Sequence, residues 1–231
     1  MRVSLVVRRL TFLLAGSLVL TESSSSQTVS GDVVVAAPKH SANVSGVTAR
    51  MDGWWIGGEM GFEAGRLRLS ASGMRGQLTA ADPGSLPQHD VGEVSVNGDY
   101  RARPWLGLEL RYTARAFSSA AGYQRWNLLG VGATTSRELG TAAVRAFAVL
   151  QYFPLVSVSQ QEEPSFGLGS DVGIAVSPSA LPLAVTLSYR IERFTYPAAA
   201  ARSAQFEALT LSVGLRARRH AGGWKVGGAG Q

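Results

Sequence analysis

The residues best suited to chemistry in this sequence are fourteen charged side chains that alternate with apolar ones. Seven acids and seven bases make up the set: Glu59, Glu63, Glu93, Asp99, Glu109, Asp171 and Glu192, with Arg66, Arg68, Arg101, Arg111, Arg115, Arg145 and Arg190. Arginine outnumbers lysine twenty to two in the chain. A planar guanidinium can bridge carboxylates bidentately, although a GC-rich genome would give the same bias. We predict a confined interior in which these charges pair with one another.

Groups that could carry out catalysis are sparse in this sequence. It contains no cysteine, which excludes a thiolate nucleophile, a thiolate zinc site and disulfide bonds. The three histidines are far apart along the chain: His40, His89 and His220. The best acid–base candidate is the neighbouring pair His89 and Asp90, and Glu162 with Glu163 could bind a divalent cation. Both pairs also fit solvated loops, and we expect no catalytic residue, no metal site and no cofactor.

The charged side chains lie in segments where apolar and polar residues alternate with a period of two. Between Trp105 and Phe117, for example, Leu106, Leu108 and Leu110 share one face, and the charged residues share the other. This is the spacing of a β-strand, whose successive side chains point to opposite faces. Nine segments follow it: residues 54–64, 66–77, 91–102, 105–117, 126–136, 141–153, 166–176, 183–196 and 206–216. The sequence therefore predicts an all-β fold.

The connections between these segments alternate in length, as they do in a meander of hairpins. Short connections alternate with four longer ones: residues 78–90, 118–125, 154–165 and 197–205. If both chain ends lie on the side of the short connections, the number of strands must be even. One more strand is therefore expected before Trp54. Residues 27–37 and residues 43–51 are the candidates, the latter followed by a predicted Asp52-Gly53 turn. We predict about ten strands, or eight if two weak segments do not pair. They close into an antiparallel barrel, because an open sheet would leave unpaired edges.

Eleven of the nineteen aromatic residues fall near strand ends on the side of the long connections: Trp54, Trp55, Phe117, Tyr123, Trp126, Tyr152, Phe153, Phe166, Phe194, Tyr196 and Phe206. The core of a soluble barrel would spread its aromatic residues along the strand middles, whereas a bilayer draws them to its interface with water. We therefore predict an aromatic girdle at one membrane surface.

The first residues have the composition of an export signal. Three arginines within the first nine residues precede an apolar stretch from Leu10 to Leu20. We assign residues 1–26 to a signal peptide whose cleavage site the sequence leaves open. The rest of the chain divides into an N-terminal segment with a possible first strand, the barrel, and a basic glycine-rich tail: residues 27–53, 54–219 and 220–231.

The net charge of +6 is concentrated at the two ends of the chain. Without residues 1–26 it falls to +4, and Arg216, Arg218, Arg219 and Lys225 account for that remainder. A nucleic-acid-binding face would show a clustered basic stripe with interleaved aromatic residues. We therefore expect no nucleic-acid partner.

The export signal, the aromatic residues, the arginine-rich interior and the alternating connections resemble the small bacterial outer-membrane β-barrels of eight to ten strands. The resemblance covers residues 54–216, in pattern only. It implies an up-and-down transmembrane barrel in the bacterial outer membrane, in contact with its lipid and lipopolysaccharide and inserted by the barrel insertion machinery. One feature departs from the family, whose last strand usually ends on an aromatic residue. Here the strand ends at Leu215 and runs into the basic tail.

The charge balance and the narrow lumen predict the function in outline. A barrel of ten strands or fewer can be filled by its own side chains, and we expect a plugged, non-enzymatic body. Its five outward loops would serve structure, adhesion or interaction, with narrow solute passage as a variant. A membrane-embedded hydrolase using His89 is one alternative. A secreted, lipocalin-like barrel is another, and it would gather Leu108, Leu110 and Leu187 into a core that binds an apolar ligand.

Overall fold

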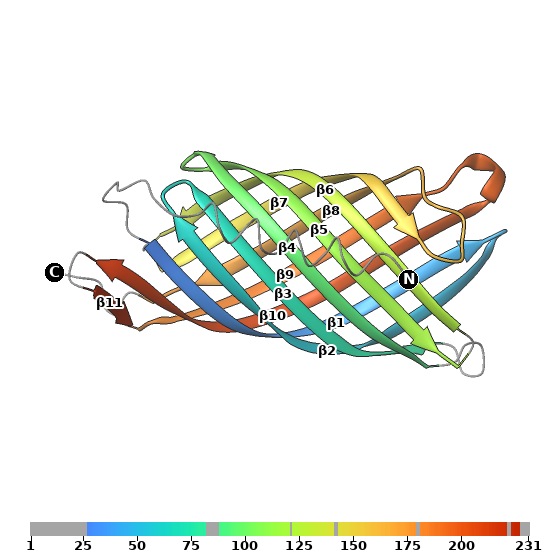
Figure 1. The fold of residues 1–231 in the computed structure, drawn as a ribbon, viewed down its shortest axis with the longest axis horizontal. Helices are drawn as coiled ribbons and strands as arrows, with labels where there is room; N and C mark the ends of the chain where they lie inside the picture. Colours follow the sequence, from blue (N-terminus) through green and yellow to red (C-terminus); the bar gives the residue numbers. More distant parts are fainter. Residues whose placement is uncertain are drawn as a thin grey trace, which may run out of the picture.

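The computed structural model describes residues 27–81, 88–120, 122–140, 143–178, 181–220 and 223–226 (Figure 1), and the expected signal peptide lies outside them. The strands are β1 Gln27–Val44, β2 Val47–Ala64, β3 Leu67–Ala80, β4 His89–Arg103, β5 Leu106–Ser119, β6 Gly122–Leu139, β7 Val144–Val158, β8 Phe166–Val176, β9 Leu183–Thr195, β10 Arg202–His220 and β11 Gly223–Val226. A short 3-10 helix, η1 (Ala198–Ala200), lies between β9 and β10. Within the described ranges no helix is long and apolar enough to cross a membrane.

Ten strands close into one antiparallel barrel. Each strand from β1 to β10 pairs with the next, and β1 also pairs with β10 along its whole length, from Gln27 opposite Arg219 to Val44 opposite Arg202. This closure removes the exposed edges that an open sheet would present. The predicted closed, ten-stranded, all-β barrel is confirmed, and the eight-stranded alternative is wrong. The short strand β11 pairs with the end of β10, within the predicted tail.

The barrel begins at Gln27, so the boundary predicted at Trp54 is too late. Of the two candidates for the first strand, residues 27–37 form the start of β1, while residues 43–51 contain a turn. Ser45 and Gly46 make this turn with φ angles of 51° and 86°, the left-handed pair that a two-residue hairpin loop requires. The Asp52-Gly53 turn is wrong, because both residues lie within β2.

The two ends of the barrel differ in what they carry. The terminal end is the end of the barrel where β1 begins and where the barrel part of β10 finishes (Figure 1). We call the opposite end the distal end. The distal connections are residues 45–46, 81–88, 120–121, 159–165 and 196–201. They are shorter than predicted because the strands extend beyond their apolar segments. The long loop expected at residues 118–125 is reduced to two residues.

The apolar face of each strand points away from the barrel axis. Leu108, Leu110 and Leu187 are 56%, 54% and 51% exposed, while Arg111 and Glu192 are buried in the interior. The outward residues form an apolar band, as the wall of a membrane barrel requires. A soluble, lipocalin-like barrel would have the opposite arrangement, and that alternative is wrong.

Closer to the distal end the outer surface becomes polar. Seven charged residues of the strands are exposed there: Lys39, Arg50, Asp52, Arg75, Asp90, Arg125 and Arg193. The same strands carry apolar outward residues nearer the terminal end, such as Ile56 on β2 and Val94 on β4. The barrel wall therefore continues past its apolar band.

Candidate functional site

The interior of the barrel is filled in layers, because neighbouring strands place the same kinds of residue at the same height. Along β5, from the distal end inward, the lumen-facing residues are Phe117, Arg115, Thr113, Arg111 and Glu109. Along β9 the order is again an aromatic residue followed by charged and then small polar ones. Three parts result: a distal apolar cluster, a central charge network and a cavity at the terminal end.

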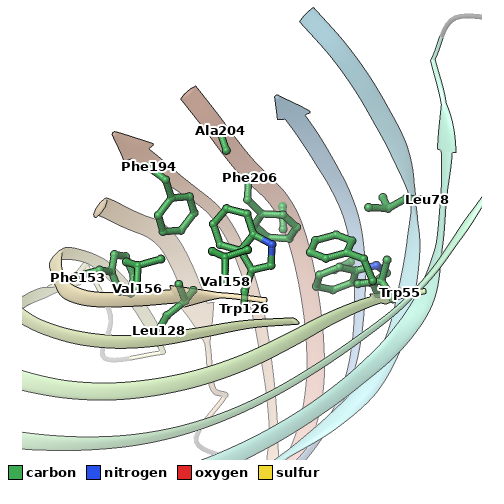
Figure 2. Close-up of a cluster of buried hydrophobic side chains, with 14 of the residues drawn as sticks. Trp55, Leu78, Trp126, Leu128, Phe153, Val156, Val158, Phe194, Ala204 and Phe206 are labelled. Carbon is green, nitrogen blue, oxygen red and sulfur yellow. The ribbon is translucent and has the colours of Figure 1, made fainter. Parts of the chain in front are cut away.

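The distal apolar cluster occupies one end of the lumen. Its buried members are Ala36, Trp55, Leu78, Val91, Phe117, Trp126, Leu128, Phe153, Val156, Val158, Phe194, Tyr196, Ala204, Phe206 and Ala208. Figure 2 shows side chains from the surrounding strands pointing toward one another across the barrel. Trp55 stacks on Phe206 with ring centroids 5.2 Å apart, and Trp126 meets Phe194 at 5.0 Å.

A β-bulge and two glycines shape the cluster around Phe153. The pairing of β6 with β7 shifts register between Leu129 and Val131, where Phe153 and Pro154 stand on the opposite strand. Proline is tolerated at such a bulge because it has no N–H to donate. Phe153 points inward in phase with Val149 and Gln151, and the bulge then reverses the alternation so that Val156 and Val158 also point inward. A Cβ added at Gly130 would lie 2.8 Å from its ring, and one at Gly169 would lie 2.9 Å from it.

The predicted aromatic girdle is wrong for most of its members. Seven of the eleven residues are buried inside the barrel: Trp55, Phe117, Trp126, Phe153, Phe194, Tyr196 and Phe206. Trp54, Tyr123 and Tyr152 are exposed on the outside, and Phe166 lies beside Tyr152 with ring centroids 6.2 Å apart. Position near a strand end gives the height of a residue in the barrel, and only its parity along the strand gives the face.

The central charge network is a closed set of two acids and two bases. The guanidinium of Arg115 lies 2.6 Å from the Glu93 carboxylate and 2.9 Å from that of Glu192. Arg190 lies 2.9 Å from Glu93 and 3.8 Å from Glu192. The Arg115 guanidinium also sits 3.7 Å above the ring centroid of Phe206, which joins this layer to the apolar cluster. Burial of these ions is tolerated because each has opposite charges beside it.

A second group of ion pairs lies nearer the terminal end and recruits neutral partners. Arg111 Nε lies 2.9 Å from Glu109 Oε1 and donates to Asn97 Oδ1 at 2.9 Å. Gln151 donates to Glu109 and accepts from Arg111 at 3.3 Å. Asn97 and Gln151 were missed from the sequence because only charges were counted. Their positions on β4 and β7 alternate with the outward residues, so the sequence could have placed both side chains in the interior.

The structure joins ten of the fourteen predicted charges in ion pairs. Beyond the pairs above, Arg68 lies 3.4 Å from Glu59 and Arg101 lies 3.1 Å from Glu63. Four predicted members are outside these pairs: Arg66, Asp99, Arg145 and Asp171. Arg66 lies in the turn between β2 and β3 and is exposed.

The terminal end of the lumen is a cavity of about 320 Å³. Its deep wall is formed by the ion pairs around Arg111 and Glu109, and arginines are gathered at its mouth. Hydroxyl groups line much of the wall between them, including Ser70, Ser72 and Thr134. The interior therefore holds packed apolar side chains at the distal end and a cavity at the terminal end.

The proposed acid–base pair is not assembled. His89 points into the lumen, whereas Asp90 lies on the outer face and accepts a hydrogen bond from Gln77 Nε2 at 3.1 Å. His40 also faces the interior, where its ring lies 5.3 Å from that of Phe117. Among the described residues, no group of three or more histidines, aspartates or glutamates could hold a metal ion.

The distal rim above these histidines carries further polar contacts. Glu163 accepts a hydrogen bond from Ser157 Oγ at 2.9 Å. The guanidinium of Arg202 lies 5.0 Å from the ring centroid of Tyr196 and donates to Gln161. Burial raises the pKa of Tyr196, which lies in the connection after β9. The rim therefore supplies polar groups, and the described residues bring none of its carboxylates to His89.

Comparison with known proteins places the fold. No protein-family model matches the chain, and no curated protein matches it in sequence. Among solved structures, the chain is similar to the outer membrane protease OmpT from Escherichia coli, with a TM-score of 0.51 at 13% identity, covering 87% of this chain and 99% of that one. The translocator domain of the autotransporter NalP from Neisseria meningitidis gives 0.46 at 12% identity, covering 91% and 94%. Neisserial surface protein A gives 0.37 at 15%, covering 82% and 96%.

The similarity to OmpT is one of fold. It shows that the chain shares the architecture of the bacterial outer-membrane β-barrels, as its sequence pattern predicted. A closed barrel with an apolar outer band satisfies every backbone hydrogen bond within the bilayer, which is how strands cross a membrane. The predicted location in the bacterial outer membrane agrees with both features.

Proposed function

We propose that this chain is a non-enzymatic outer-membrane barrel with a sealed lumen, which serves as a rigid anchor and presents its distal wall for contacts outside the bilayer. The observation that carries the proposal is the distal apolar cluster, in which Trp55, Phe153 and Phe206 are 0% exposed. A conducting barrel needs a continuous polar path from end to end. Here the path is interrupted by packed aromatic rings.

The central charge network adds a second barrier in series with the first. Arg115 and Glu192 are only 2% and 1% exposed, and they lie next to the aromatic rings. Their charges are satisfied by one another, so an ion entering this layer would have to break existing pairs. A solute would therefore meet an apolar barrier and then a fixed ionic one. This arrangement supports a structural role over passage.

The distal wall is the surface that remains for interaction. Its connections are short, so the contacts offered are those of outward strand residues more than of long loops. Four exposed arginines lie just beyond the apolar band: Arg50, Arg75, Arg125 and Arg193. Lipopolysaccharide carries phosphate groups at this height of a bilayer, and guanidinium groups bind phosphate bidentately. We include lipopolysaccharide among the proposed contacts, and insertion by the barrel machinery remains part of the proposal.

Planar-bilayer recording tests the sealed lumen. The purified protein, shown to be folded by its heat-modifiable gel migration, is expected to give no steady conductance. Replacing Trp126, Phe194 and Phe206 together by alanine is expected to allow transient openings, while Tyr152→Ala on the lipid-facing side is the matched control. Steady, ohmic channels from the unaltered protein would contradict the proposal.

A hydrolase using His89 is the second candidate; the placement of two histidines favours it, and the absence of a hydrogen-bonded acid among the described residues counts against it. His40 and His89 both face the lumen at its distal end, each with a buried Nδ1 atom that makes no hydrogen bond among the described residues. An imidazole without a hydrogen-bonded acid lacks the orienting partner that acid–base catalysis uses. Peptide and lipid turnover should be measured for the unaltered protein, His89→Ala and His40→Ala. Activity that disappears in either variant would favour the hydrolase.

A further inference from the structure

We propose that the cavity at the terminal end of the lumen binds a small multivalent anion, one that carries two or more carboxylate or phosphate groups, with Arg145 at the centre of the site. The proposal is independent of whether the lumen conducts. It rests on the shape of the cavity, on the balance of charge around it and on the surroundings of Arg145.

The cavity has the size and position of a binding site. Its volume of about 320 Å³ lies at the lower end of the range of roughly 300–1,000 Å³ found for small-molecule pockets. Glu109 and Arg111 line it deeper in the lumen, and Glu93 and Arg190 of the central charge network form its floor. A ligand could enter from the terminal end and would not pass through. The cavity is a dead end, which suits binding.

Positive charge exceeds negative charge around the mouth of the cavity. Six arginines line it: Arg66, Arg68, Arg101, Arg103, Arg145 and Arg216. Four carboxylates face them: Asp32, Glu59, Glu63 and Asp99. The deeper part of the lining adds Arg111 and Arg190 against Glu93, Glu109 and Asp171. Eight arginines therefore face seven carboxylates in all, and a surplus of one positive charge remains. An anion that occupied the mouth would remove the imbalance.

Arg145 has the surroundings that a bound anion would stabilise most. It takes part in no ion pair within the part of the chain that the structure describes, and it is only partly exposed. Three further arginines, Arg216, Arg68 and Arg101, lie near it, together with Glu63. Glu138 stands opposite it on β6. Clustered like charges destabilise a fold unless a counter-ion lies between them.

The neighbouring pairs leave donors available for a ligand. Arg68 meets Glu59 through a single contact at 3.4 Å, and Arg101 meets Glu63 through a single contact at 3.1 Å. A guanidinium has five N–H groups, so each can bind a second acceptor without giving up its carboxylate. Ser70, also in the wall, adds a hydroxyl of the kind that completes the hydrogen bonding of carboxylate or phosphate oxygens. This donor set favours an anion over a neutral ligand.

Isothermal titration of the full barrel in an uncharged detergent at low salt tests the site. Pyrophosphate and citrate are the two probes, and they separate a preference for phosphate from one for carboxylate. We expect saturable binding of at least one probe with one site per barrel. Arg145→Gln is expected to weaken it tenfold or more, and Glu63→Gln, which removes a competing carboxylate, is expected to strengthen it.

A matched control separates a built site from general attraction to arginine. Arg75→Gln removes the same charge from the outer face near the distal end and should leave the affinity unchanged. Arg101→Gln provides a second lumen variant if Arg145→Gln does not fold, as judged by gel migration. Absence of saturable binding of both probes, or equal losses in Arg75→Gln and the lumen variants, would overturn the proposal.

Discussion

Replacing Arg115 by methionine is expected to lower the free energy of unfolding by about 3–5 kcal/mol. Arg115 is 2% exposed and touches both acids of the central charge network, Glu93 at 2.6 Å and Glu192 at 2.9 Å. Methionine keeps most of the side-chain volume and removes the charge. Two buried carboxylates are then left with Arg190 alone, which lies 3.8 Å from Glu192. The uncompensated carboxylate accounts for most of the loss.

The cation–π contact of Arg115 with Phe206 contributes a smaller share. At 3.7 Å from the ring centroid a desolvated contact of this kind is worth about 2 kcal/mol. Arg115→Lys keeps the charge and cannot reach both carboxylates in the same way, so it should fall between the methionine variant and the unaltered protein. Arg75→Met, on the outer face near the distal end, is the control and should change the stability by less than about 0.5 kcal/mol.

Urea unfolding in lipid vesicles gives the measurement, followed by tryptophan fluorescence and by the fraction of folded protein on gels. Trp55 and Trp126 report from the adjoining apolar cluster. The second substitution Glu192→Gln, made in the Arg115→Met background, removes the unpaired charge and should restore about half of the lost stability. If Arg115→Met costs less than about 1 kcal/mol, or if Glu192→Gln gives no recovery, the network is not the stabilising unit described here.

Three further outcomes follow from the packing. Gly130→Ala should destabilise the barrel by about 1–3 kcal/mol in the same urea assay, because its Cβ would meet the ring of Phe153 at 2.8 Å, whereas Gly73→Ala, with nothing within 4 Å, should be tolerated. Phe206→Ala, at a position that is 0% exposed, should cost about 3–5 kcal/mol through the space it leaves, and equal stability of the two proteins would contradict the sealed cluster. Leu150→Arg, at an outward position that is 70% exposed, should lower the free energy of unfolding in vesicles by about 2–4 kcal/mol. An unchanged free energy of unfolding would show that this face does not meet lipid.

The strands and their closure could be predicted from the sequence because period-two alternation is a local property. The extent of the strands could not, since their distal parts carry polar residues on the outer face and resemble loops. Asp52 illustrates this, because beside Gly53 it has the composition of a hairpin turn and yet lies within β2. The true turn at Ser45-Gly46 carries a weaker sequence signal.

The interior was harder to predict because it depends on parity and on contacts between distant strands. The bulge at Phe153 and Pro154 reverses the inward face of β7 partway along, which alternation counted from either end misses. The partners of each charge come from different strands, as when Arg115 on β5 reaches Glu192 on β9. Counting seven acids and seven bases predicted an interior able to balance its charge, and it could not identify neutral partners such as Gln151.

The distal apolar cluster also has a consequence for how the chain tolerates its surroundings. Leu78 lies between the outward residues Gln77 and Thr79, and Trp126 lies between Arg125 and Asn127. At the distal end the apolar side chains face the interior and the polar ones face water, as in an ordinary water-soluble protein. Nearer the terminal end the arrangement is reversed, with apolar side chains facing the bilayer. The distal end has its own apolar core, whose burial does not depend on lipid. Stripping away the bilayer should therefore loosen the barrel first from its terminal end.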